Sequence, residues 1–280
     1  MILLPMLLFL AQDPLSADDI MARVAANQDR ADQMRADFVY HQDVLIRLNR
    51  KNGKLAREEY SQYTVTPTAD GTKKERQLFR GKYMDRGKEV EFDKPGYEHK
   101  KIDIDAGLLI GLSESFVNDK KSRDGIEHDF FPLTSEEQRN YVFHLEGTED
   151  YRGTPVYRIT FEPKKKPALL DADEEGDDED VWAGEALIDR GEFQPVIVTT
   201  TLAEKVPLWV KAVLGTDVKA LGFKVTYKKF DQGVWFPVTY GGEFQVKGLF
   251  LYSRRIGISM RNSGFHHADV HSHITYAAVP

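Results

Sequence analysis

Four of the chain's eight histidines lie close together near the C-terminus, in the stretch GFHHADVHSHITY at residues 264–276. They are His266, His267, His271 and His273. Imidazole nitrogens bind transition metals and change protonation near neutral pH, so this stretch is the first place to look for chemistry. If residues 269–277 form a strand, His271 and His273 share one face, and the apolar Val270 lies on the other.

Spacing decides how these histidines can be used. Side chains two residues apart in a strand lie about 6.5–7 Å apart along it, so His271 and His273 converge on one metal only with help from a neighbouring strand. The alternation favours the exposed face of a closing strand, with a pH-sensitive surface as an alternative. Whether His267, His271 and His273 bind a metal stays open, and no metal site is predicted.

Other signatures of catalysis are absent from the sequence. It contains no G-x-S-x-G, H-E-x-x-H, P-loop or G-x-G-x-x-G pattern. The chain has no cysteine, and therefore no disulfide, thiolate ligand or cysteine nucleophile. We therefore expect a protein that is not an enzyme and uses no cofactor, with an enzyme built on the histidine stretch as the least favoured hypothesis.

Negative charge is concentrated in one segment. Residues 171–180, DADEEGDDED, carry eight acidic groups and no basic one. Removing these eight from the formal net charge of −7 leaves +1 for the rest of the chain. Because no basic stripe is present to neutralise phosphates, nucleic acid is excluded as a partner. The acidic segment is interpreted as a solvated loop.

The N-terminal residues 1–12 begin with an apolar run, MILLPMLLFL. This run is too short to span a bilayer and has the length of the core of a secretory signal. The alternative to a secretory signal is an apolar first strand or helical turn. With an export signal and no cysteine for lipid attachment, we expect a soluble periplasmic protein.

The elements that must position any site begin with one helix. Ser16 and Asp19 form a capping pattern, and an apolar stripe continues to about Arg35. The period then changes to two, with Phe38, Tyr40, Val44, Ile46 and Leu48 on one face of a long strand. Lys51-Asn52-Gly53-Lys54 predicts a hairpin, because Asn-Gly suits a type I′ turn, and residues 55–66 should form its second strand.

Two apolar segments interrupt a series of strands. Residues 105–118 and 207–214 each predict a short apolar helix, either a plain core helix or a lid over a cavity. The strands are predicted near the following ranges: 75–80, 88–93, 141–145, 155–163, 181–190, 193–203, 221–231, 234–246, 249–260 and 269–277. This pattern predicts an α+β fold in which a large curved antiparallel sheet wraps an apolar interior and the helices cover its open side. We expect residues 13–280 to form a single domain.

Several segments resemble the outer-membrane lipoprotein-sorting family of LolA/LolB-type carriers. They are DIMARVAANQDRADQMRADFVYHQ at 19–42, GKEVEFDKPGYEHKKID at 87–103 and YRGTPVYRITFEPKKK at 151–166, together with the signal-like start. The resemblance implies an incomplete β-barrel of about eleven antiparallel strands, plugged by helices and holding an apolar cavity that receives acyl chains. It also implies a carrier or sensor and not an enzyme.

An acyl chain gains about 0.8 kcal/mol for each methylene it buries, so such a cavity needs an apolar lining. The residues expected to line it are Phe38, Tyr40, Val44, Ile46, Leu108, Leu109, Leu112, Phe116, Leu208, Trp209 and Val213. A filled core made by the same residues is the alternative. The sequence thus predicts a monomeric periplasmic carrier of lipid or lipoprotein acyl chains, with transport partners at the inner and outer membranes. A non-transporting envelope sensor on the same fold is the alternative function.

Overall fold

The structure is a computed structural model, and it describes most of the chain. The described residues are 15–68, 71–116, 131–164, 182–202, 217–219, 222–230, 233–247 and 252–268. The predicted helix at 207–214, the predicted strand at 269–277 and the acidic segment lie outside them. No helix in the described ranges is both long enough and apolar enough to span a bilayer.

The first element, α1 (Ala17–Arg35), begins at the predicted cap. The Ser16 hydroxyl accepts a hydrogen bond from the Asp19 amide at 3.1 Å, and the Asp19 carboxylate accepts one from the Ser16 amide at 3.2 Å. This reciprocal pair satisfies two amides that a helix start otherwise leaves without partners. The buried face of α1, which includes Ile20 and Val24, packs on the sheet.

The strands are all antiparallel to their neighbours and form one sheet. They are β1 (Phe38–Arg50), β2 (Leu55–Thr68), β3 (Gly71–Asp85), β4 (Lys88–Phe92), β5 (Tyr141–Tyr151), β6 (Thr154–Pro163), β7 (Trp182–Asp189), β8 (Pro195–Leu202), β9 (Asp217–Lys219), β10 (Gly222–Lys229), β11 (Trp235–Lys247) and β12 (Ser253–His267). Their order is β4-β3-β2-β1-β12-β11-β10-β8-β7-β6-β5, with β9 paired to β11. Because β4 and β5 end the sheet without pairing to each other, the fold is α+β with an incomplete barrel, as predicted.

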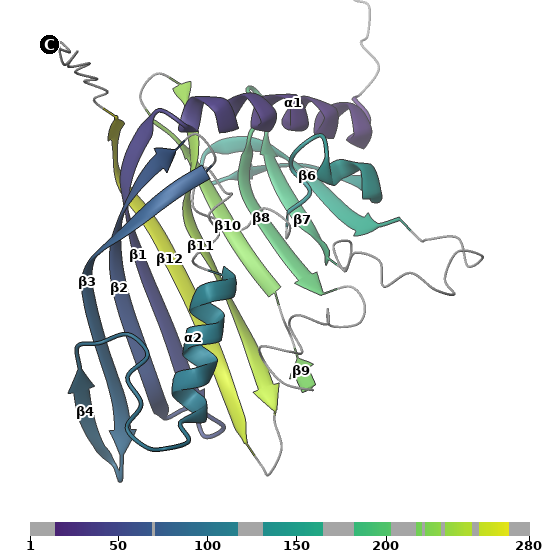
Figure 1. Ribbon diagram of the computed structural model, residues 1–280. Coiled ribbons are helices and arrows are strands. Elements are labelled where there is room, and N and C mark those ends of the chain that lie inside the picture. The colour runs from purple at the N-terminus through teal and green to yellow at the C-terminus, as the bar shows by residue number, and fades with distance from the viewer. Residues whose placement is uncertain are drawn as a thin grey trace, which may run out of the picture.

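This strand order explains where the second helix lies. The strands β4 and β5 follow one another in sequence but sit at opposite ends of the sheet, so the chain between them must cross its width. That connection carries α2 (Ile104–Phe116) and the 3₁₀ turn η1 (Glu137–Asn140). Figure 1 shows α2 running along the strands in front of the sheet, and α1 lying across one end of it.

The core fills the concave face of the sheet. Alternate residues of β1 are buried, including Tyr40, Val44 and Ile46, as their shared parity predicted. They belong to one cluster with Ile20 of α1 and Leu109 of α2. The cluster extends through β12, β11, β10 and β8 to Phe161 of β6, so both helices and most strands share a single apolar interior.

The structure differs from the sequence predictions at one turn and in several strands, since β3 and β5 are longer than predicted and β9 was not predicted. The hairpin after β1 is present, but its type I′ turn is wrong: only Gly53 has a positive φ, +79°. The Gly53 amide donates to the Arg50 carbonyl at 2.8 Å, which gives a three-residue loop with glycine in the left-handed position. The last described strand also continues past 260 to His267, because β12 stays paired with β1 along its length.

Candidate functional site

A pocket of about 280 Å³ lies between α2 and the concave face of β1, β2 and β3. Its apolar wall includes Val44 and Ile46 of β1 and Leu109 of α2, all of them buried. Phe79 of β3 and the loop residues Pro95 and Gly96 complete this side. The volume is at the lower end of the range for small-molecule pockets, so the pocket suits one acyl chain and not several.

The polar lining of the pocket starts with Glu59 of β2. Hairpin pairing places Glu59 opposite Ile46 and therefore on the concave face. Its carboxylate accepts hydrogen bonds from Arg57 Nε at 3.0 Å and Arg57 Nη2 at 2.8 Å. Burial raises the pKa of Glu59, and the hydrogen bonds and charge of Arg57 oppose that rise. The negative charge at this end of the pocket is thus already matched by a cation.

Arg76 of β3 is the second charged group in the lining, and it is exposed. Its guanidinium donates to the hydroxyl of Tyr63 from Nη2 at 3.0 Å and lies over the Tyr63 ring, 5.3 Å from the centroid. Among the residues that the structure describes, no carboxylate forms an ion pair with it. Arg76 therefore presents a positive charge beside the pocket; it makes no ion pair with the described residues but is attracted by Glu59, and Glu114 of α2 adds an exposed carboxylate to the lining.

The position of α2 over the pocket is set by Asp103, whose side chain has no exposed surface. The Asp103 carboxylate accepts from the Ala106 amide at 3.2 Å, which caps the helix, and pairs with Arg57 Nη1 at 3.4 Å. The Nδ1 atom of His99 lies 2.6 Å from the same carboxylate. Burial alone would raise the pKa of Asp103, but the amides of Ala106 and His99 and the neighbouring His99 and Arg57 bring that pKa below 3.8.

A second aspartate ties the first turn of α2 to the middle of the sheet. Asp105 accepts hydrogen bonds from Arg254 Nε at 2.8 Å and Nη2 at 2.9 Å, and from the Tyr252 hydroxyl at 2.7 Å. Burial and then the charge of Asp105 raise the pKa of Tyr252, so this hydroxyl stays a donor. The start of α2 is therefore held by charged groups on both sides.

The residues predicted to line an acyl cavity are placed as follows. Val44, Ile46 and Leu109 line the pocket together. Tyr40, Leu108 and Leu112 lie in the core cluster beside them. Phe38 packs elsewhere, in a small cluster with Val234 and Phe236. The side chain of Phe116 and the residues Leu208, Trp209 and Val213 lie outside what the structure describes.

The sequence reasoning missed the polar half of the pocket. Glu59 and Arg76 were not among the predicted residues, although one signal could have found the first of them. Arg57, Glu59 and Ser61 share the parity of the buried Val65 in β2, so charged side chains at inward positions were visible in the hairpin. A charge at an inward strand position needs a partner, and here the partner completes the site.

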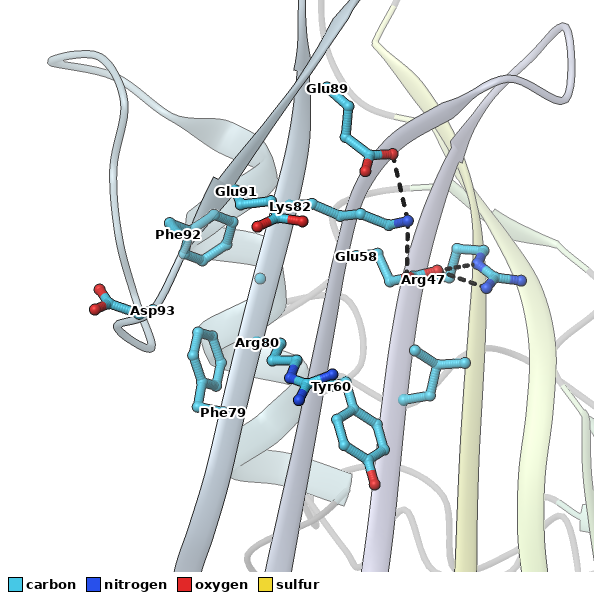
Figure 2. A pocket seen from close by; sticks show the side chains of 12 residues that line it. Arg47, Glu58, Tyr60, Phe79, Arg80, Lys82, Glu89, Glu91, Phe92 and Asp93 are labelled. Atoms are coloured by element: carbon cyan, nitrogen blue, oxygen red, sulfur yellow. Dashed lines mark hydrogen bonds and ion pairs between the residues drawn. The ribbon is translucent and has the colours of Figure 1, made fainter.

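A larger groove of about 770 Å³ lies on the other face of the same strands. Figure 2 shows a run of charges along it, from Arg47 to Glu58, then to Lys82, which bridges to Glu89. Lys82 Nζ is 3.5 Å from the Glu58 carboxylate and 3.3 Å from that of Glu89. Because burying such groups under an acyl chain costs free energy, this groove suits a solvated ionic face better than a lipid site.

The histidine stretch is only partly described. His267 ends β12 opposite Phe38, and the centroids of the two rings are 4.2 Å apart. His266 Nδ1 lies 2.9 Å from the Gly264 carbonyl oxygen. Within the described ranges no group of three or more His, Cys, Asp or Glu side chains is arranged to hold a metal ion. His271 and His273 lie outside those ranges, so their part in metal binding stays a prediction.

No family model matches the sequence, and no curated protein matches it. Among solved structures, a LolA superfamily protein from Nitrosomonas europaea is 10% identical, covers 92% of this chain and 96% of its own, and has a TM-score of 0.37. A DUF1329 family protein from Desulfovibrio piger is 12% identical, with 93% and 96% covered and a TM-score of 0.37. The lipoprotein LppX from Mycobacterium tuberculosis is 11% identical, with 89% and 95% covered and a TM-score of 0.25.

One of these solved structures is a LolA superfamily protein, and the sequence resembles the LolA/LolB-type carriers. At these identities and TM-scores the likeness carries no argument about ligand or role.

Proposed function

We propose that the protein binds an acyl chain of a lipid or lipoprotein in the pocket under α2 and acts as a periplasmic carrier of the outer-membrane lipoprotein-sorting type. The observation that supports this is the apolar wall of Val44, Ile46 and Leu109, which faces a space of about 280 Å³ on the concave side of the sheet.

The chemistry of the lining supports an amphipathic ligand. An acyl chain placed against Val44, Ile46 and Leu109 leaves water for an apolar surface, which is favourable in proportion to its length. The polar end of such a ligand would lie toward Arg76, which is exposed and has no ion-pair partner in the described part of the chain. Transport partners at the two membranes are part of the same proposal.

A chain-length series tests the binding step. We expect the affinity for saturated fatty acids to rise about fourfold with each added methylene, since each contributes about 0.8 kcal/mol, until the chain outgrows the pocket. Isothermal titration or displacement of a fluorescent fatty acid measures this slope. Affinity that does not change with chain length would contradict the proposal.

A pocket-filling variant locates the site. Ser113 of α2 lines the pocket, so Ser113→Phe should occupy part of the space and lower the affinity for the longest chains by about tenfold or more. Ser263→Phe places the same side chain at an exposed position near the end of β12 and is the matched control. Lipids extracted from the natively purified protein and identified by mass spectrometry would then name the physiological ligand.

A further inference from the structure

The segment at the start of α2 exposes its isoleucines, buries Asp103 and half-buries Asp105. In Lys100-Lys101-Ile102-Asp103-Ile104-Asp105, Ile102 is 75% exposed and Ile104 is 54% exposed. Asp103 is buried at 6%, and Asp105 is held by Arg254 and Tyr252. This arrangement is the reverse of the usual soluble surface, where aliphatic side chains turn inward and carboxylates face water.

The buried aspartates fix the isoleucines in this outward position. Arg57 holds Asp103, the residue before α2, and Arg254 holds Asp105 in its first turn, and with both aspartates held in this way Ile102 and Ile104 are left on the outer side. The exposure is therefore held by ion pairs with little exposed surface, and it is not the chance position of a loose loop.

The apolar surface continues onto neighbouring residues. Tyr97 is 40% exposed in the same loop, and Ile110, six residues after Ile104 and so about 120° from it around α2, is 37% exposed. Of the α2 positions whose burial is described, Ile104, Gly107, Ile110 and Glu114 are exposed. We call Tyr97, Ile102, Ile104 and Ile110, with Lys100 and Lys101, the Ile102 surface. Figure 1 shows α2 standing in front of the sheet.

The basic residues indicate what covers the Ile102 surface. Lys100 and Lys101 are exposed next to Ile102, and Lys94 is exposed at the start of the loop. Asp93 and Glu98 are exposed acidic side chains in the same loop. Although the whole chain carries a formal charge of −7, this segment combines protruding isoleucines with clustered lysines. Such a combination fits the boundary between acyl chains and anionic head groups of a lipid bilayer.

We propose that the Ile102 surface docks the protein on a membrane that contains anionic lipids. Ile102 and Ile104 enter the outer acyl region, and Lys100 and Lys101 contact the lipid phosphates. A few protruding side chains suffice for this contact, whereas a stable protein interface needs about 800 Å² from each partner. At 13 residues α2 is too short to cross the bilayer and stays at its surface. The proposal stands apart from the pocket, although Ile110 belongs to both.

Vesicle flotation tests the docking directly. The full chain is mixed with vesicles of equal parts phosphatidylcholine and phosphatidylglycerol, and the fraction that floats gives a partition coefficient. The double variants Ile102→Ser with Ile104→Ser and Lys100→Glu with Lys101→Glu should each lower this coefficient by at least about tenfold. Pure phosphatidylcholine vesicles should bind the unaltered protein less strongly, and added salt should weaken binding to the anionic vesicles.

Two matched controls distinguish binding through the Ile102 surface from nonspecific membrane binding. Val142 and Leu145 of β5 are 36% and 38% exposed, so their double serine variant removes similar apolar side chains elsewhere. Lys224→Glu with Lys228→Glu makes the same charge change on β10, where both lysines are exposed. All variants keep residues 1–14, so a difference between them cannot come from that apolar segment. Circular dichroism confirms that each variant is folded.

Three results would overturn the proposal. One is an unaltered protein that does not float with anionic vesicles. Another is an isoleucine or lysine double variant that floats as well as its matched control. The third is a dimer of the unaltered protein, seen by sedimentation, that the isoleucine variant abolishes without a change in vesicle binding, because the surface would then join two copies of this chain.

Discussion

At the scale of single residues, the most informative contacts are made by charged side chains that face inward, and not by the histidines. Arg57 is buried on the concave face, where it meets Glu59, Asp103 and the carbonyl of Tyr97. Arg57 shares the parity of the buried Val65 in β2, a signal of its inward direction that the sequence predictions did not use. Its partner Asp103 was not predictable, because the two residues lie 46 positions apart and meet only after the connection from β4 folds back over the sheet.

The Asp103 carboxylate should give the fold a specific acid sensitivity. Folding lowers its pKa below 3.8, so the ionised form contributes stability above about pH 3.8, and this contribution is lost as the pH falls through the lowered value. Asp103→Asn keeps an oxygen that can cap α2 but removes the charge. We expect it to lower the free energy of unfolding by about 1–3 kcal/mol at pH 7. Urea unfolding curves measure this difference.

The pH dependence of that difference is the decisive readout. It should shrink toward zero as the pH is lowered below about 3.8, since the two proteins then carry the same charge at this position. Glu98→Gln, an exposed change of the same kind five residues away, should have little effect at any pH. A loss in Asp103→Asn that stays constant from neutral to acid pH would show that packing, and not charge, is responsible.

Arg76 should set the preference of the pocket for a negatively charged ligand. Arg76→Gln removes the charge but keeps a side chain that can reach Tyr63, so affinity for a fatty acid should fall about tenfold. Affinity for the alcohol of the same chain length should change little. Arg80→Gln, on the same strand but in the outer groove, is the control. An equal loss for acid and alcohol would assign Arg76 to packing only.

At the scale of elements, the sequence predicted α1, the β1–β2 hairpin and the helix over the sheet, because each has a local signature. The period of two in β1 and the capping pair at Ser16 were sufficient. It did not predict β9, which has only three residues, or the full length of β12, because both depend on pairing with strands distant in sequence. The outward isoleucines of α2 were equally hidden, since an apolar helix does not reveal which of its faces is covered.

The anchoring of α2 by Asp105 should be visible in its exchange with solvent. Asp105→Ala removes the partner of Arg254 and Tyr252, so the first turns of α2 should open more often. We expect amide exchange in residues 106–112 to accelerate at least about tenfold, measured by mass spectrometry, with α1 unchanged. Glu58→Ala breaks ion pairs on the outer face and should leave α2 protected. Equal protection in both variants would refute the anchoring role.

At the scale of the whole molecule, the sheet is two strand series joined in the middle. The strands β1 to β4 run outward on one side, β5 to β12 return from the other edge, and β1 pairs with β12 from Phe38 to Arg50. The strand order could not be read from the sequence, since the pairing of β1 with β12 joins residues more than two hundred positions apart. Apolar alternation predicted which face is buried in each strand but not which strand lies next to it.

The junction of the two series provides a test of the predicted single domain. Across it, Gln42 of β1 donates to the Asn262 side chain at 3.0 Å, and Asn262 donates to the Pro237 carbonyl at 3.0 Å, all within the core. Asn262→Ala should therefore lower the free energy of unfolding by about 1–3 kcal/mol, and the exposed Ser263→Ala by far less. The two series can be followed by different probes. Because both helices and both series share one apolar cluster, far-ultraviolet circular dichroism and tryptophan fluorescence should report the same lowered unfolding midpoint for Asn262→Ala. Trp182 lies in β7 and Trp235 in β11, so tryptophan fluorescence reports on the series from β5 to β12. If the fluorescence midpoint is unchanged while the circular dichroism midpoint falls, the two series unfold separately and the chain is not one domain.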